Sequence, residues 1–466
     1  MVFSSLVFLC GFLPLVLALY YLCPPRGRNF VLLIASLFFY AWGEPKYIFI
    51  MIFSSVFDYC NGRMIEHFRS KNRENGAKVV LVVSVIGNLA ILGTFKYSDF
   101  VISNINSLTG AGISLLNIAL PIGISFYTFQ TMSYTIDVYR GDVAAQHNIL
   151  DFATYVCMFP QLIAGPILRY TDVEKELMHR TITCDHIANG LHRFSIGLAK
   201  KVLIANQAGS LWTEISGLSS LDMPLAWLGA ISYTLQIYFD FSGYSDMAIG
   251  LGEMLGFMYP ENFLHPYESK SITEFWRKWH VTLSSWFKEY VYIPLGGSRR
   301  GNGRTIVNLF IVWALTGIWH GAGWNFVMWG IYYFILLVLE KNVWGKSLEK
   351  LPAVFQHIYA LFFIIIGWVL FANESLSSVW HFLQAMFGFG INNNMTMYYI
   401  RTHLILLIIA AIGATTLPVK AYRYVTGKMS ERAAEIITNI MTIAFLIICY
   451  AFLVGDSYNP FLYFRF

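Results

Sequence analysis

The stretch IVNLFIVWALTGIWHGAGWNFVMWGIYYFILLVLE, residues 306–340, decides the fold class. It holds two apolar runs, at 306–319 and 322–340, and a helix needs about 20 such residues to cross the hydrocarbon of a bilayer. His320 and a cluster of glycines lie between the runs. We expect the helix to break there, and non-helical backbone at membrane depth is tolerated only where protein or a water-filled cavity satisfies its polar groups. The stretch therefore predicts membrane helices that meet at a buried histidine.

The rest of the chain is similarly apolar. Hydrophobic residues make up 56% of the 466 residues and charged residues 13%, whereas soluble domains carry roughly 25% charged residues. The remaining apolar runs lie at 2–22, 30–42, 46–60, 79–96, 115–136, 149–165, 194–212, 224–239, 243–258, 354–372, 402–417 and 436–455. The shorter runs are expected to be re-entrant, tilted or half-helices. We predict an all-α transmembrane bundle with about 10–11 crossings, amphipathic helices and one domain over residues 1–466.

Basic residues in the loops predict the orientation of the chain. Lys and Arg cluster between the apolar runs, for example at 63–78, 299–304, 341–350 and 420–432, and such clusters face the cytoplasm. The first run has no preceding basic residue, so it is expected to be an uncleaved anchor with its N-terminus outside. Counting crossings from these loops places an aromatic tail, residues 456–466, outside the cytoplasm as well. No basic stripe alternates with exposed aromatic residues, so nucleic acid is not an expected partner.

His320 is the leading candidate for chemistry. An ionisable residue at membrane depth is a functional candidate by default, and an imidazole titrates near neutral pH, which suits it to take and return a proton. The alternative is a buried histidine that bonds a carbonyl group. Trp319 and Asn325 belong to the same motif and are candidate substrate contacts. The six cysteines are scattered without metal-ligand spacing, so no metal site is expected.

A second candidate is the segment 271–290, which has the pattern of an amphipathic helix. Ser271 and Glu274 fit a capping box at its start. The inward face of this helix would carry Trp276, His280, Leu283 and Phe287, and the other face Arg277, Lys278, Thr282 and Lys288. The cationic side chains are explained either by extension toward the membrane surface or by contact with an anionic donor such as the phosphates of coenzyme A. Trp276, Arg277 and Lys278 are accordingly candidate substrate-binding residues, and His280 is a second catalytic candidate.

Two carboxylates, Asp240 and Asp246, lie within a strongly apolar segment. A buried carboxylate is costly unless it is bonded. We expect structural hydrogen bonds to neighbouring serine, tyrosine or backbone groups, with direct proton transfer as the alternative.

Three motifs together give the chain a resemblance to a known family. They are YFDFSGYSD at 238–246, FWRKWH at 275–280 and GIWHGA at 317–322, and the likeness extends to MVFSS at 1–5, SFYTFQ at 125–130, FPQLIAGP at 159–166 and NPFLYFRF at 459–466. At these residues the chain resembles the bacterial membrane-bound O-acyltransferases over nearly its whole length. Among the branches of that family it is most similar to the one for alginate O-acetylation, with teichoic-acid D-alanylation as a close relative.

The resemblance implies a helical bundle in which a funnel reaches a buried histidine, here His320, with His280 as a second polar position. It also implies an enzyme of the bacterial plasma membrane that takes an acyl group from a cytoplasmic thioester. The expected donor is acetyl-CoA, with an acyl or D-alanyl carrier protein as the alternative, and no bound cofactor is expected. The acyl group would pass to an extracytoplasmic acyltransferase of the SGNH type, or to its equivalent in D-alanylation, which acylates a polysaccharide. Tyr463 matches a C-terminal tyrosine of related systems that accepts the acyl group, and is otherwise an aromatic anchor at the interface.

A transporter or flippase for a lipid-linked saccharide is the alternative from another functional class. Broken helices, buried histidines and buried carboxylates also mark transport pathways. The histidine between glycines and the tryptophan-rich segment favour the enzyme.

Overall fold

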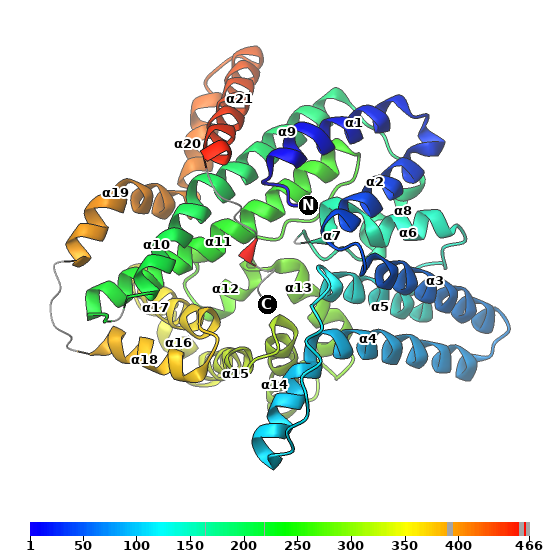
Figure 1. Ribbon diagram of the computed structural model, residues 1–466, viewed down its shortest axis with the longest axis horizontal. Helices are drawn as coiled ribbons and strands as arrows, with labels where there is room; N and C mark the ends of the chain where they lie inside the picture. The colour runs from blue at the N-terminus through cyan, green and yellow to red at the C-terminus, as the bar shows by residue number, and fades with distance from the viewer. Residues whose placement is uncertain (164, 219, 389–394, 456–460, 463–466) are drawn as a thin grey trace. The chain divides into compact units, whose positions relative to one another are not determined.

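The computed structural model describes residues 1–163, 165–218, 220–388, 395–455 and 461–462 (Figure 1). These described residues form helices, turns and irregular segments and contain no strand, so the all-α prediction is confirmed. The chain divides into two compact units, residues 1–194 with 247–260 and residues 195–246 with 261–466. Because two of the boundaries fall inside helices, they do not mark a linker, and the single-domain prediction stays a prediction.

The first unit begins with a short π-helical segment, Phe8–Phe12, and a 3-10 turn, Pro25–Gly27. Its helices are α1 (Leu13–Leu22), α2 (Arg28–Gly43), α3 (Ile48–Ser70), α4 (Glu74–Thr109), α5 (Ile124–Arg140), α6 (Ile149–Cys157), α7 (Phe159–Leu162), α8 (Tyr170–Met178) and most of α9 (Cys184–Ala199). The run predicted at 149–165 is thus a pair of short helices rather than a full span, in keeping with the expectation for the shorter runs.

The second unit continues α9 through a π-helical segment, η3 (Lys200–Ala205). Its helices are α10 (Asn206–Ser216), α11 (Met223–Met254), α12 (Ile272–Lys278), α13 (Val281–Phe287), α14 (Asn302–His320), α15 (Trp324–Leu339), α16 (Gly345–Leu348), α17 (Ala353–Ala372), α18 (Leu376–Phe387), α19 (Met395–Gly413), α20 (Leu417–Thr426) and α21 (Glu431–Gly455). Further π-helical segments lie at Lys288–Tyr292 and Glu340–Trp344, the latter named η6, and a 3-10 turn at Pro266–Glu268.

The apolar runs at 224–239 and 243–258 are not separate elements. They form most of one continuous helix, α11, whose last turns belong to the first unit. The polar residues of this stretch do not interrupt the helix, and the side chains of Asp240 and Asp246 pair with lysines of the same unit.

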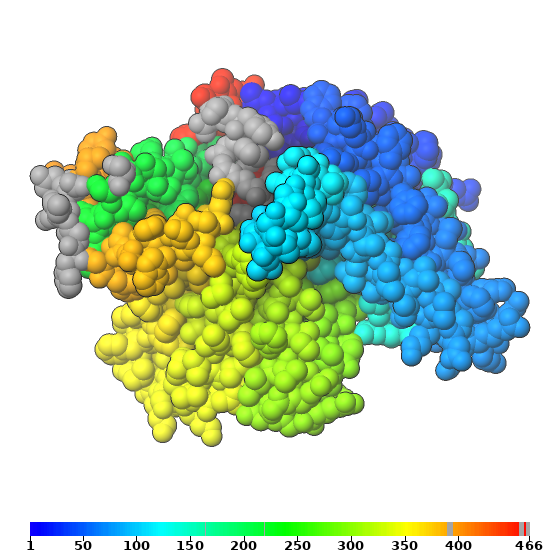
Figure 2. Space-filling model, turned by 60° about the horizontal axis from the view of Figure 1, so that its bottom comes forward, coloured from blue at the N-terminus to red at the C-terminus, as the bar shows by residue number. Residues whose placement is uncertain are grey.

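Six helical stretches among the described residues are long and apolar enough to cross a membrane: Ile48–Ser70, Glu74–Thr109, Trp324–Leu348, Ala353–Ala372, Met395–Gly413 and Glu431–Gly455. The predicted number of crossings is larger and stays a prediction. In the first unit, α4 lies at the surface toward the viewer in Figure 2, and its exposed side chains include Val79, Ile86 and Leu108. Apolar side chains on an outer helix are suited to contact lipid.

Polar side chains also join helices inside the first unit. Asp58 of α3 is fully buried and accepts hydrogen bonds from Ser84 at 2.6 Å and Asn88 at 2.6 Å, both on α4. Thr131 of α5 donates to the side chain of Asn88 at 3.2 Å. A buried polar network of this kind fixes the register of its three helices because each member loses a partner if one helix shifts.

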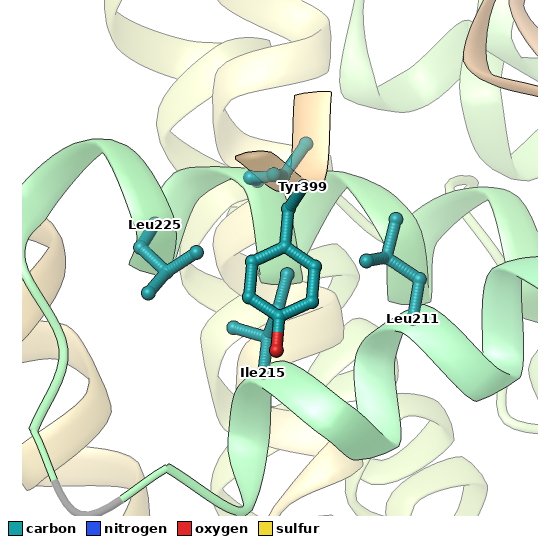
Figure 3. Close-up of a cluster of buried hydrophobic side chains, with 5 residues drawn as sticks. Leu211, Ile215, Leu225 and Tyr399 are labelled. Atoms are coloured by element: carbon teal, nitrogen blue, oxygen red, sulfur yellow. The ribbon is translucent and has the colours of Figure 1, made fainter. Parts of the chain in front are cut away.

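The second unit has an apolar core between α10, α11 and α19. The ring of Tyr399 lies among Leu211, Ile215 and Leu225 (Figure 3), and all four side chains are buried. This core joins α19 to the part of α11 that precedes the buried carboxylates.

Candidate active site

The helix breaks at His320 as the sequence predicts. Helix α14 ends at His320, Gly321 is extended, and α15 begins at Trp324. The two helices then pack closely, because Gly317 and Gly330 face each other: a Cβ on Gly317 would lie 3.3 Å from the Cα of Gly330. Small residues at a membrane helix crossing allow this approach. The close crossing brings the end of α14 onto the first turns of α15.

His320 lies in a shell of aromatic rings and is 5% exposed. Its ring meets those of Trp319 and Trp329 edge to face with ring centroids 5.0 Å apart, and that of Phe371 at 5.3 Å. Phe371 comes from α17, so three consecutive long helices contribute to the shell. An apolar shell excludes water and strengthens electrostatic interactions inside it.

The predicted amphipathic helix over 271–290 is wrong as a single helix. It is divided into α12, which ends at Lys278, and α13, which begins at Val281. His280 lies at the break in the left-handed region, with φ 47° and ψ 54°, a conformation that non-glycine residues seldom adopt. The start of the helix is as predicted, because Ser271 Oγ accepts from the backbone N–H of Glu274 at 3.0 Å.

Asn262 holds this break in place. Its backbone carbonyl accepts from the N–H of Val281 at 3.0 Å. Its side-chain Oδ1 accepts from Thr282 N at 3.3 Å and Thr282 Oγ at 2.9 Å, and lies 3.1 Å from His280 Nδ1. Tertiary contacts therefore fix the left-handed turn, which is why the periodicity of the sequence did not reveal it.

These contacts also settle the tautomer of His280. The backbone N–H of Thr282 can only donate, so the side-chain atom of Asn262 that it contacts is the amide oxygen, an acceptor. His280 Nδ1 must then carry the proton, and Nε2 presents a lone pair. Nε2 is buried and has no hydrogen-bond partner among the described residues. His280 lies outside the six candidate spans, and burial lowers the pKa of its imidazole to about 3, so the ring is neutral and its Nε2 can accept.

The two histidines share one aromatic neighbour. The Trp319 ring lies with its centroid 5.0 Å from that of His320 and 6.1 Å from that of His280. On its other side His280 meets Phe241 edge to face at 4.7 Å. The structure therefore places both predicted catalytic histidines, with Trp319, in one buried site.

Two residues of the C-terminal tail, Phe461 and Leu462, lie in the same part of the second unit. Phe461 and Leu462 are buried, and the Phe461 ring packs on Tyr244 at 4.5 Å and Phe241 at 5.7 Å. The backbone N–H of Leu462 donates to Asp240 Oδ2 at 2.8 Å. These two residues thus fold back into the protein. Tyr463, the predicted acyl acceptor, lies outside the described residues.

Asp240 and Asp246 have partners that the sequence analysis missed. We expected serine, tyrosine or backbone groups, and one backbone group, the N–H of Leu462, is present. The other partners are lysines: Lys201 pairs with Asp240, and Lys200 with Asp246 at 2.6 Å. They were missed because they lie 39 and 46 residues earlier in the sequence, on another helical segment.

The remaining candidate residues have mixed positions. Trp276 packs on Trp329 at 5.4 Å, so it extends the aromatic shell of His320. Asn325 is buried in the first turn of α15. Lys278 pairs with Glu274 at 2.7 Å, while Arg277 is exposed on the opposite side of this short helix from its buried residues.

Glu340 is a further residue that sequence reasoning missed. It is buried in η6 at the end of α15, and its two carboxylate oxygens accept from the backbone N–H groups of Ile272 and Thr273, each at 2.8 Å. A carboxylate at a helix N-terminus satisfies otherwise unpaired donors and complements the helix dipole. Glu340 therefore anchors α12, the helix that leads to His280, onto the helix that follows His320.

Comparison with known proteins gives the family relationships of the chain. Residues 140–376 match the MBOAT, membrane-bound O-acyltransferase family. The chain is 46% identical over 394 residues to a probable alginate O-acetylase, AlgI, of Pseudomonas aeruginosa, covering 84% of this chain and 75% of that one. It is 32% identical over 523 residues to a peptidoglycan O-acetyltransferase of Helicobacter pylori, covering 100% and 98%. It is 26% identical over 276 residues to a teichoic acid D-alanyltransferase of Bacillus subtilis, covering 55% and 70%.

Proposed function

Because the chain belongs to the membrane-bound O-acyltransferase family, we propose that it transfers acetyl groups from cytoplasmic acetyl-CoA for the O-acetylation of an exported polysaccharide of the alginate type. The chain is a multi-pass membrane enzyme, and this answers the transporter alternative. The 46% identity to a probable alginate O-acetylase, against 26% to a D-alanyltransferase, favours acetyl over D-alanyl transfer.

The observation that carries the proposal is the buried pair of histidines around Trp319. Acyl transfer needs a base that takes the proton from the attacking hydroxyl as its oxygen bonds to the thioester carbonyl carbon. The proton then goes to the sulfur as the carbon–sulfur bond breaks. We assign this task to His320, which lies where apolar walls exclude water. Nε2 of His280 has no hydrogen-bond partner among the residues that the structure describes, and we assign His280 to orient the donor by accepting a hydrogen bond.

The proposal includes a direction across the membrane. The donor reaches the histidines from the cytoplasm of a bacterium, and the acetyl group leaves toward the outer face, where both chain termini lie. An extracytoplasmic acyltransferase of the SGNH type then places it on the polysaccharide. Tyr463 is the proposed relay: its phenol oxygen takes the acetyl group from the thioester, and the resulting aryl ester passes it to the partner. The buried Phe461 and Leu462 support this role, since Phe461 packs on Phe241, which also meets His280, and Leu462 directly precedes Tyr463 in the sequence.

The test of the enzymatic role is His320→Ala in the intact membrane protein. A general base contributes roughly 10²–10⁴-fold, so acetyl transfer from labelled acetyl-CoA should fall by that factor while the amount of protein in the membrane is unchanged. Near-normal transfer by a well-expressed variant would remove His320 from the mechanism. Mass spectrometry of the envelope polymers after gene deletion distinguishes the acyl group, because loss of D-alanyl esters with acetyl esters intact would replace acetyl transfer by the alternative.

The test of the relay is Tyr463→Phe. The ring and its packing remain and only the hydroxyl is lost, so an interface anchor should tolerate the change. A relay requires polymer acetylation to stop at an unchanged protein level. Normal acetylation in this variant would return Tyr463 to an anchoring role.

A further inference from the structure

One face of α11 carries two carboxylates that lie close to the lysines of a neighbouring helical segment. Asp240, Gly243 and Asp246 follow one another at intervals of three and therefore lie along one side of the helix. Gly243 has no side chain between the carboxylates, and a Cβ there would lie 2.8 Å from the carbonyl oxygen of Gly197 and 3.1 Å from the backbone nitrogen of Lys201. The backbone of α9 and η3 thus approaches α11 at Gly243, so neighbouring lysines reach both carboxylates.

The two lysines are adjacent in the sequence, and both face α11. Lys200 and Lys201 open the π-helical segment η3. A π-helical turn changes the direction of side chains relative to an α-helix and is frequent at functional sites. Lys200 pairs with Asp246 at 2.6 Å, and Lys201 pairs with Asp240. The Lys201–Asp240 pair is the more deeply buried, with side chains 3% and 2% exposed.

The second oxygen of Asp240 binds the backbone of Leu462. Leu462 N–H donates to Asp240 Oδ2 at 2.8 Å, and the ring of the preceding Phe461 packs on Tyr244 and Phe241. Phe241 in turn meets the ring of His280 at 4.7 Å. One aromatic ring, that of Phe241, therefore lies between Phe461 and His280.

We propose that Lys201 and Asp240 form a tail clasp. In this clasp, Asp240 binds the backbone N–H of Leu462 and thereby positions the C-terminal tail at the histidine site for acyl transfer. Lys201 keeps the Asp240 carboxylate oriented, and a carboxylate is a stronger acceptor for an N–H group than a neutral oxygen. Asp240 is in this account a positioning residue. The inference rests on the proposed function, because it gives the tail a part in the transfer.

The test uses two double variants of the full chain that differ in one property. Lys201→Met/Asp240→Asn removes both charges but keeps an oxygen that can accept from Leu462. Lys201→Met/Asp240→Leu removes both charges and the acceptor. Replacing a buried ion pair by uncharged residues of similar volume is often tolerated, so both variants should fold. The matched comparison isolates the hydrogen bond to the tail from the general effect of losing the pair.

The first readout is the docking of the tail, which needs no activity. Leu462→Cys keeps the backbone N–H, and its thiol can be labelled with a maleimide after replacement of Cys10, Cys23, Cys60 and Cys184, which are not buried. One hydrogen bond changes an equilibrium by about fivefold. Labelling should therefore be about fivefold faster in the leucine variant than in the asparagine variant. Equal labelling rates would overturn the clasp.

The second readout is polymer acetylation by the same pairs with Leu462 restored. We expect the leucine variant to lose about fivefold in turnover relative to the asparagine variant, with the KM for acetyl-CoA unchanged. If the Lys201–Asp240 pair were merely structural, turnover would fall equally in both variants. Faster labelling with equal acetylation would overturn the positioning role. Failure of the proposed function is distinguishable, because Leu462→Cys with the clasp intact would then still be labelled slowly, while the wild-type protein would show no acetyl transfer at all.

Discussion

Asn262 controls His280 through a contact that can be changed without touching either histidine. Its Oδ1 lies 3.1 Å from His280 Nδ1 and accepts from Thr282. Asn262→Leu removes the acceptor, so the neutral ring is free to place its proton on Nε2 and lose the lone pair of that nitrogen. A neutral hydrogen bond is worth about 1 kcal/mol net, with an upper range near 1.5, which corresponds to a loss of about five- to tenfold in the fraction of competent rings. We expect kcat/KM for acetyl-CoA to fall by that factor, and by more in His280→Ala, which removes the ring.

The pH dependence of Asn262→Asp gives the second half of this prediction. A carboxylate beside Nδ1 favours the imidazolium and raises the pKa of His280 from its low value of about 3. Protonated His280 carries hydrogens on both nitrogens and cannot accept at Nε2. The activity of Asn262→Asp relative to wild type should therefore be lowest at acid pH and rise as the pH passes the raised pKa.

The assay is acetyl transfer by purified protein, normalised to folded protein. Asn308→Leu is the matched control, because it deletes a buried amide that bonds the carbonyl of Gly297 at 2.9 Å, and no contact between Asn308 and either histidine is seen among the described residues. It should retain kcat/KM. Wild-type kcat/KM in Asn262→Leu, or a relative activity of Asn262→Asp that does not change with pH, would refute the reasoning.

Two further predictions concern the packing around the site. Gly243→Ala places a methyl group 2.8 Å from the Gly197 carbonyl oxygen, so overpacking should destabilise the protein by about 1–3 kcal/mol. Gly93→Ala is the control, because a Cβ at Gly93 would meet no atom of the described residues within 4 Å. A thermal midpoint of Gly243→Ala that is no lower than that of Gly93→Ala would contradict this prediction. Glu340→Ala leaves the N–H groups of Ile272 and Thr273 without their acceptor and should lower both thermal stability and turnover. Glu340→Gln should be intermediate. Equal turnover in the two variants and wild type would show that the anchoring of α12 does not matter for catalysis.

The sequence allowed the break at His320 to be predicted because its cause is local. Glycines on both sides of a histidine disfavour a continuing helix whatever surrounds them. The break at His280 has no such local signal: the residues around it fit a helix, and contacts from an earlier loop, made by Asn262 and by Leu264 N–H to the carbonyl of Lys278, impose the turn. The histidines could be named from the sequence, whereas the residue that fixes the tautomer of His280 could not.

The partners of the buried carboxylates illustrate the same limit. Burial of Asp240 and Asp246 was predictable from their apolar surroundings. Their pairing with Lys201 and Lys200 was not, since it depends on a π-helical turn and on the absence of a side chain at Gly243. Phe461 and Leu462 fold back into the protein because exposed apolar side chains in a short tail would be poorly solvated.

The left-handed backbone of His280 means that alanine scanning at this position measures a mixture. An alanine there loses the imidazole and also meets a conformational penalty of roughly 1–2 kcal/mol, which glycine does not have and asparagine tolerates better. A ranking of substitutions by protein yield would put glycine and asparagine first, while a ranking by acetyl transfer would put them beside alanine. The difference between the two rankings separates the effect of residue 280 on folding, through its backbone conformation, from its effect on the reaction, through its imidazole.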